Sequence, residues 1–181
     1  DVSAAPQSSI RRSDCALILV GTTRGELGGS ALVHTLKTYD GNVPEPSPNA
    51  LVIAQRIHAV IRRGFVDACH DCSEGGLAVS LAEMVMDTAC GMVVDLAQVP
   101  CSEAMSDARL LFSESTARYV IAVEADAVQE VTNLLSDVPH AVIGKTTSDR
   151  RLEVSKDGVQ VAIWTNESLL QAHHSNPDFV S

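Results

Sequence analysis

Short apolar runs alternate with amphipathic stretches along most of the chain. The apolar runs predict strands at 16–20, 65–69, 91–99, 118–123 and 141–146, and the amphipathic stretches predict helices at 30–37, 49–63, 77–86, 102–112 and 125–136. Two further runs, 151–154 and 159–164, flank a turn signal and predict a hairpin, which a final helix at 166–173 follows with Asn166 as its cap. This alternation predicts a layered α/β or α+β fold in which helices pack on a mixed sheet.

The same pattern predicts a single domain over 16–171, between a linker or cut end at 1–15 and a short tail at 172–181. Three prolines predict a loop at 39–48. In the longest predicted helix, five residues share the face that we expect to be buried: Leu51, Ala54, Ile57, His58 and Ile61. The chain shows no internal repeat, and its start without Met indicates a cut end.

Composition narrows the classes of function. The 181 residues carry 13 Lys and Arg against 23 Asp and Glu, a net charge of −10, which argues against binding to nucleic acid or to an anionic membrane surface. No apolar stretch approaches the roughly 18 residues that span a bilayer, and the polar start has no apolar signal core. The five scattered cysteines are typical of reduced thiols, so we expect a cytoplasmic protein.

A first glycine-containing loop links the strand at 16–20 to the next helix. It ends in Gly28, Gly29 and Ser30, where glycines let a ligand approach the backbone and the amides of a helix start favour anions. The loop matches no nucleotide-binding fingerprint, and a tight turn with a capping serine explains it equally well.

A second such loop spans His70 to Gly76. Asp71 and Glu74 have the spacing of a capping box, with Asp71 as cap, while Gly75 and Gly76 each disfavour a first helical turn by about 1 kcal/mol. Either close packing of the helix or a ligand that faces the backbone amides of residues 73–76 would offset this cost. Cys69 and Cys72 form a C-x-x-C pair, but no second pair completes a zinc site, so we predict no metal ligand.

A polar segment interrupts two apolar stretches near residue 114. Ser113, Glu114, Ser115 and Arg118 combine a carboxylate, hydroxyls and a guanidinium, which suit the hydroxyl or phosphate groups of a ligand. A solvated connection between a helix and a strand is the alternative interpretation.

Together these stretches resemble a known family. E-L-G-G-S at 26–30, D-C-S-E-G-G-L-A-V-S-L-A-E-M at 71–84, L-F-S-E-S at 111–115 and Arg118 occur in the order found in the C-terminal domain of phosphoribosylformylglycinamidine synthases, members of the AIR synthase superfamily. The resemblance runs from about residue 16 to 171 and is closest to the second of that enzyme's two tandem copies. The first copy carries an E-S-Q tripeptide that contacts the substrate, and here the matching place holds Glu114, Ser115 and Thr116.

The resemblance implies an ATP-dependent carbon–nitrogen ligase of purine biosynthesis. In that family ATP activates the amide oxygen of formylglycinamide ribonucleotide, and ammonia derived from glutamine displaces the phosphate to give the amidine. The family binds most of its ATP and Mg²⁺ on N-terminal domains, so we expect the isolated chain to be inactive and assign it no catalytic residue. Implied partners are those domains, a glutaminase subunit and a small accessory subunit.

The resemblance also implies where substrate or phosphate would bind. The residues expected there are Gly28, Gly29, Ser30, Asp71, Ser73, Glu74, Gly75, Gly76, Ser113, Glu114, Ser115 and Arg118. A scaffold domain without a direct role in catalysis, or the C-terminal domain of another enzyme of the superfamily, remain alternatives.

Overall fold

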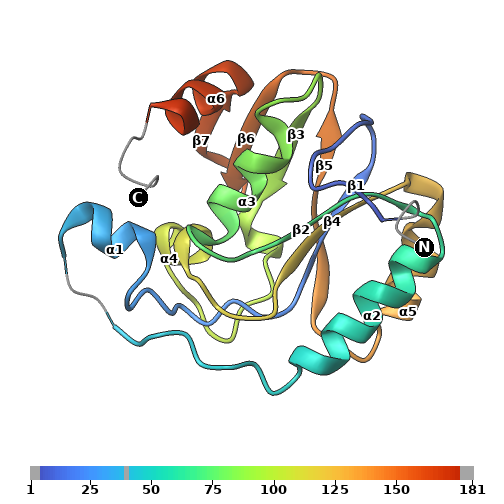
Figure 1. The fold of residues 1–181 in the computed structure, drawn as a ribbon, viewed down its shortest axis with the longest axis horizontal. Helices are drawn as coiled ribbons and strands as arrows, with labels where there is room; N and C mark the ends of the chain where they lie inside the picture. Colours follow the sequence, from blue (N-terminus) through green and yellow to red (C-terminus); the bar gives the residue numbers. More distant parts are fainter. Residues whose placement is uncertain (1–4, 39–40, 176–181) are drawn as a thin grey trace.

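In the computed structural model, which describes residues 5–38 and 41–175, one mixed sheet of seven strands carries the fold (Figure 1). The order across the sheet is β2-β4-β1-β5-β3-β6-β7, and every neighbouring pair is antiparallel except β3 and β6. The strands are β1 (Ala16–Val20), β2 (Val66–Asp71), β3 (Gly91–Asp95), β4 (Tyr119–Val123), β5 (His140–Thr147), β6 (Arg151–Lys156) and β7 (Val159–Thr165). The predicted α/β fold with a mixed sheet is confirmed.

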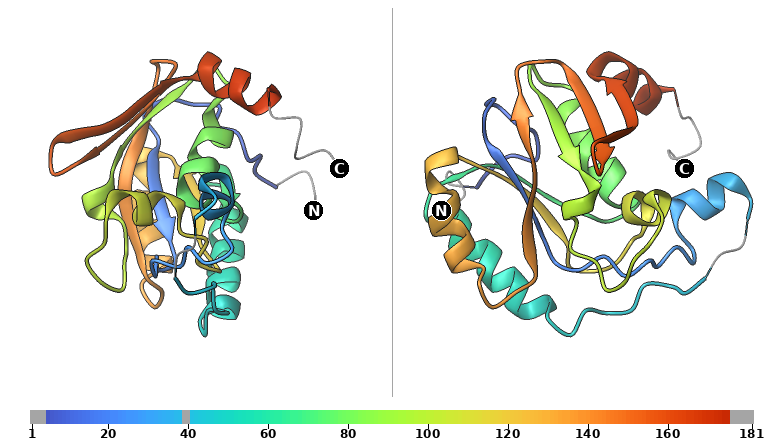
Figure 2. Two further views of the ribbon diagram at one scale, coloured as in Figure 1. Left: turned by 90° about the vertical axis from the view of Figure 1, so that its left-hand side faces the viewer. Right: turned by 180° about the vertical axis from the view of Figure 1, so that it is seen from behind.

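Six α-helices and two short 3₁₀ turns connect these strands within the described residues. They are α1 (Ala31–Leu36), α2 (Ala50–Arg62), α3 (Gly76–Val85), η2 (Leu96–Gln98), α4 (Asp107–Phe112), η3 (Ala125–Ala127), α5 (Val128–Leu134) and α6 (Asn166–His174). α2 and α5 lie side by side at one end of the sheet, while α1 lies beside α4 away from them (Figures 1 and 2). Tyr39 and Asp40, in the predicted loop at 39–48, lie outside the described residues.

Two hydrophobic clusters cover opposite faces of the sheet. Leu17 and Leu19 of β1 point into the cluster under α3 and α4, whereas Ile18 and Val20 point into the cluster under α2 and α5. Successive side chains of a strand alternate between faces, so a strand that is buried on both sides shows an unbroken apolar run. This explains why the run at 16–20 predicts β1 without error.

The buried face of α2 agrees with the predicted one only in part, because Ile57 is buried and Ile61 partly buried, whereas Ala54 and His58 are exposed. Ile53, Ile57 and Val60 are buried, while Leu51 is 71% exposed. The 3.6-residue period fits both faces of this apolar helix, and the position of α5 and the sheet decides between them.

The described residues before β1, 5–15, pack onto the domain, in the part of the chain where the sequence predicts a linker or cut end. Ile10 is buried in the core, and Gln7 forms a parallel bridge to Ala68 of β2. The buried carboxylate of Asp67 accepts hydrogen bonds from the backbone N–H groups of Arg11, at 2.8 Å, and Arg12, at 3.3 Å. These contacts fix the segment beside β2.

Several element boundaries and one helix cap differ from the predicted ones. The strand predicted at 91–99 ends at Asp95, whose side chain caps η2, and the helix predicted at 102–112 begins only after Ser106, which caps α4. Asn166 does not cap α6, because Thr165 does so through its hydroxyl. Asn166 is instead fully buried and donates to carbonyls at the end of α3, Val85 O at 2.8 Å and Cys90 O at 2.7 Å among them.

Candidate functional site

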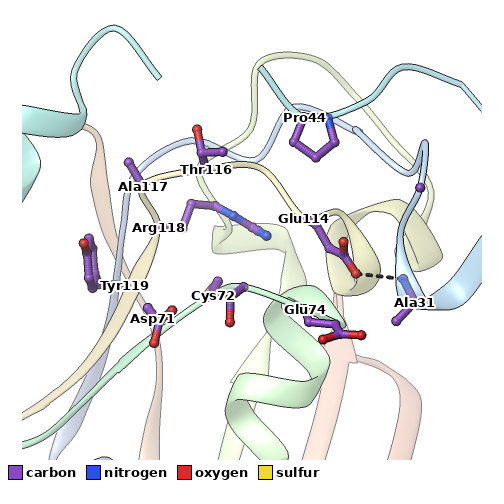
Figure 3. Close-up of a pocket in the computed structure, with 12 residues that line it drawn as sticks. Ala31, Pro44, Asp71, Cys72, Glu74, Glu114, Thr116, Ala117, Arg118 and Tyr119 are labelled. Carbon is purple, nitrogen blue, oxygen red and sulfur yellow. Dashed lines mark hydrogen bonds between the residues drawn. The ribbon is translucent and has the colours of Figure 1, made fainter. Parts of the chain in front are cut away.

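A cavity of about 490 Å³ opens where the loops before α1, α3 and β4 meet (Figure 3). The segment 41–48, which crosses from α1 toward α2, closes one side with Pro44. The lining residues are Gly29, Ala31, Pro44, Asp71, Cys72, Ser73, Glu74, Glu114, Thr116, Ala117, Arg118 and Tyr119. Thus the three segments singled out from the sequence meet at one place, although they lie far apart in the chain.

Glu114 joins two of these loops. Its Oε1 accepts a hydrogen bond from the backbone N–H of Ala31 at 2.9 Å and from that of Gly75 at 2.8 Å (Figure 3). Both N–H groups lie at helix starts, where orphan donors and the helix dipole favour a negative charge. The carboxylate of Glu114 therefore fixes the starts of α1 and α3 relative to one another.

Arg118 is the largest fully buried side chain and is only 1% exposed. Its guanidinium donates to Thr23 Oγ1 at 2.9 Å, to the carbonyl of Ser115 at 3.1 Å and to the carbonyl of Ser113. Burial lowers the pKa of Arg118, and the nearby charge of Glu26 opposes this shift. Arg118 thus holds the loop at 113–115 in its conformation through neutral acceptors.

A second buried carboxylate holds the segment 41–48 in place. Glu26, 6% exposed, accepts from the N–H of Glu45 at 3.0 Å and from Arg24 Nε at 3.3 Å. Burial raises the pKa of Glu26, but hydrogen bonds from Glu45 N–H, Ser115 and Arg24 outweigh it, so the pKa lies below its usual value. Thr116 adds a donated bond to Glu45 O at 2.9 Å. We call this segment, residues 41–48, the strap.

The start of α3 contradicts the predicted capping box. Gly75, not Asp71, occupies the N-cap position, and as a glycine it has no side chain to cap the helix itself. Asp71 belongs to the end of β2, and its exposed side chain lines the cavity. Gly76 has a φ of +64°, and a Cβ there would lie 2.4 Å from Ser113 O and 2.9 Å from Leu111 O. Close packing against the end of α4 therefore accounts for this glycine.

The twelve predicted site residues separate into three groups. Those that line the cavity are Gly29, Asp71, Ser73, Glu74, Glu114 and Arg118. Those buried beside it are Gly75, Gly76, Ser113 and Ser115, the two serines being fully buried. Gly28 and Ser30 line a second cavity of about 480 Å³ together with residues of α1. Gly29 lines both cavities and has a φ of +75° with open space around its missing Cβ.

Sequence reasoning missed several residues that build the cavity. Glu26, Arg24 and Thr23 act through backbone or side-chain partners that lie up to 95 positions away. The E-L-G-G-S stretch already contained Glu26, and its position before two glycines was the available signal.

The cysteine pair does not form a site. Cys69 packs against the cluster under α2, while Cys72 is buried in the cluster under α3, so the two thiols lie on opposite faces of the sheet. Burial raises the pKa of Cys69 to about 11, which keeps it a neutral thiol. Across residues 5–38 and 41–175, no three His, Cys, Asp or Glu side chains are placed to hold a metal ion.

The fold and the cavity together define a layered α/β domain in which the loops before α1, α3 and β4 converge on the cavity of Figure 3. A family model described as AIR synthase related protein, C-terminal domain, matches residues 12–157. The chain belongs to this family. No described helix is long and apolar enough to cross a bilayer.

Relatives place the chain more closely within that family. It is 37% identical over 164 residues to the phosphoribosylformylglycinamidine synthase subunit PurL of Methanosarcina barkeri, covering 90% of this chain and 22% of that subunit. The corresponding subunit of Methanobrevibacter smithii is 37% identical over 141 residues, covering 75% of this chain and 19% of its own length. The chain therefore spans about a fifth of the length of these curated relatives.

A solved structure shares the fold. Thermotoga maritima PurL complexed with FGAR superposes with a TM-score of 0.80 at 19% identity, covering 92% of this chain and 29% of that one. At this identity the likeness concerns the fold, and the sequence relatives carry the assignment to a PurL-type domain.

Proposed function

We propose that this chain is the C-terminal domain of a phosphoribosylformylglycinamidine synthase. In this proposal the complete enzyme converts formylglycinamide ribonucleotide to the amidine, with ATP and with ammonia from glutamine. The reaction belongs to de novo purine biosynthesis in the cytoplasm. A glutaminase subunit would supply the ammonia, and a small accessory subunit would be a further partner.

The observation that carries the proposal is the cavity of Figure 3. The three stretches that resemble the family, at 26–30, 71–84 and 111–118, meet around it. Glu114 of the third stretch is hydrogen-bonded to Glu26 of the first and to Gly75 of the second. A volume of about 490 Å³ is within the range of small-molecule sites. Convergence of separate loops on one cleft is what a substrate-binding role requires.

The residues present restrict what this domain would do in the reaction. In this proposal, no step that runs through Mg²⁺ is assigned to this domain. The chain instead binds and orients: Glu114 and the exposed Asp71 and Glu74 offer acceptors to the substrate, and Arg118 holds the loop that presents Glu114. ATP and Mg²⁺ would be held mostly by the N-terminal domains.

One experiment tests this function. ADP release is measured in the polypeptide that joins this domain to its N-terminal domains, with formylglycinamide ribonucleotide and ammonia. We expect release to require both compounds and the isolated chain to be inactive. Failure of the joined polypeptide to use this substrate would refute the proposal, and turnover by the isolated chain would refute the expected inactivity.

A matched pair of variants ties activity to the cavity. Gly29→Ala places a methyl group at the cavity mouth, and Gly64→Ala places one in equally open space at the end of α2. The two glycines have similar φ values, +75° and +79°, so the backbone cost is nearly the same. We expect Gly29→Ala alone to raise the KM for the ribonucleotide, and equal effects would exclude this cavity as the substrate site.

A specific observation favours a second candidate, a scaffold domain without substrate contact. The hydroxyls of Ser115 and Thr116 both form hydrogen bonds within the protein. Ser115 accepts from Arg24 N–H at 3.0 Å, and Thr116 donates to Glu45 O at 2.9 Å. In a scaffold, Gly29→Ala would leave the KM unchanged while the joined polypeptide remained active.

A further inference from the structure

The position of Glu114 restricts the chemistry that the cavity accepts. Two backbone N–H groups at helix starts form a common binding place for phosphate oxygens. Here the chain's own carboxylate fills that place, since Glu114 Oε1 lies 2.9 Å from Ala31 N and 2.8 Å from Gly75 N. A phosphate could reach these two amides only by displacing Glu114.

The other polar groups of the cavity also disfavour an anion. Asp71 and Glu74 add two exposed carboxylates to its lining. Among the described residues, Arg118 is the only Lys or Arg that lines it, and its guanidinium turns toward Thr23 Oγ1 and two backbone carbonyls. The charged groups that the cavity presents to a ligand are therefore carboxylates.

One oxygen of Glu114 remains for a ligand. Oε2 accepts no hydrogen bond from the part of the chain that the structure describes, and Figure 3 shows the carboxylate at the edge of the cavity. The backbone beneath it is fixed, because Glu114 N–H donates to Glu26 O at 3.1 Å and Arg118 holds the carbonyls on either side. Glu114 Oε2 is thus a preorganised acceptor.

We propose that Glu114 makes this cavity selective for the hydroxyl-bearing sugar part of a ligand and against its phosphate. A carboxylate oxygen held in this way forms strong, charge-assisted hydrogen bonds with hydroxyl donors and repels phosphate oxygens. This inference rests on the proposed function and deepens it: the ribose of the ribonucleotide faces Glu114, and its phosphate points away from the amides of Ala31 and Gly75.

The test uses those two amides as reporters. In the ¹⁵N-labelled chain, the backbone resonances of Ala31 and Gly75 are followed while ribose, ribose 5-phosphate or inorganic phosphate is added. We expect ribose and ribose 5-phosphate to shift both resonances and inorganic phosphate to shift neither.

Glu114→Gln then inverts this preference. The variant keeps an oxygen for the two amides but removes the charge, so we expect ribose to bind about tenfold more weakly. We also expect inorganic phosphate to begin to shift the two resonances. Glu103→Gln removes the same charge from an exposed carboxylate that does not line the cavity, and should behave as the wild type.

Several outcomes would overturn the inference. It fails if inorganic phosphate shifts Ala31 and Gly75 in the wild type, if ribose shifts neither, or if Glu103→Gln matches Glu114→Gln. The comparison of sugar with phosphate in the wild type stands even where Glu114→Gln does not fold. If ribose binds as expected but the joined polypeptide does not use formylglycinamide ribonucleotide, the proposed function fails while the selectivity stands.

Discussion

Replacing Gly76 by alanine separates the two explanations for a glycine at the start of α3. One is contact with the end of α4, and the other is close approach of a ligand. Gly76 has a φ of +64°, and the added Cβ would lie 2.4 Å from Ser113 O and 2.9 Å from Leu111 O. Because both are backbone atoms, the contact cannot be relieved by rotating a side chain.

The magnitude follows from two contributions. A left-handed conformation costs an alanine roughly 1–2 kcal/mol. Forcing an extra carbon into a packed junction costs typically about 1–3 kcal/mol more. We therefore expect Gly76→Ala to destabilise the domain by roughly 2–5 kcal/mol, a large part of the roughly 5–15 kcal/mol that stabilises a natural domain. Gly64→Ala, with a φ of +79° and open space, should lose only the first contribution.

Urea unfolding followed by circular dichroism measures the difference between these variants. We expect a lower midpoint with an unchanged slope, and a larger loss for Gly76→Ala than for Gly64→Ala. Equal losses would show that contact with the end of α4 is not decisive. If Gly76→Ala were as stable as Gly64→Ala but failed to bind ribose, approach of a ligand would be the reason for the glycine.

Two further predictions concern buried polar side chains. Because the pKa of Glu26 is lowered in the folded state, its contribution to stability is present above the unfolded pKa of about 4.3 and is lost as the pH falls through the folded pKa. Glu26→Gln should remove this acid dependence from unfolding midpoints measured between roughly pH 2 and 7. Glu45→Gln should keep it, because the exposed Glu45 joins the network only through its backbone. Asn166→Ala should lower stability by roughly 1–3 kcal/mol because it removes the hydrogen bonds that the buried amide donates to the carbonyls of Val85, Thr88 and Cys90. An unchanged urea midpoint would contradict this account.

Local chemistry explains the elements that the sequence predicts well. β1 is predicted to the residue because it is buried on both faces and therefore apolar throughout. The hairpin of β6 and β7 follows from Asp157 and Gly158, whose φ values of +51° and +78° match the turn type that such a pair favours. In both cases, adjacent residues contain the whole signal.

Long-range partners explain what the sequence could not predict. Asn166 stands where a helix cap is expected, yet its amide reaches carbonyls 76 and 81 positions earlier. α2 offers two apolar faces, and only the packed neighbour selects Ile53 over Leu51. Glu26 has its partners in the strap and in the loop of Ser115. Each assignment depends on which segment lies opposite, and no local pattern contains that information.

The same long-range bonds decide which groups of the cavity are free for a ligand. In the loop that precedes β4, the hydroxyls of Ser113, Ser115 and Thr116 are bonded within the protein, and Arg118 is bonded to that loop. Glu114 is the exception, because one of its carboxylate oxygens faces the cavity without a partner among the described residues. Since the other four polar side chains are bonded within the protein, Glu114 is the residue of this loop that can determine which ligand binds. Substitutions at Glu114 should therefore change selectivity, while substitutions at the four bonded residues should change stability.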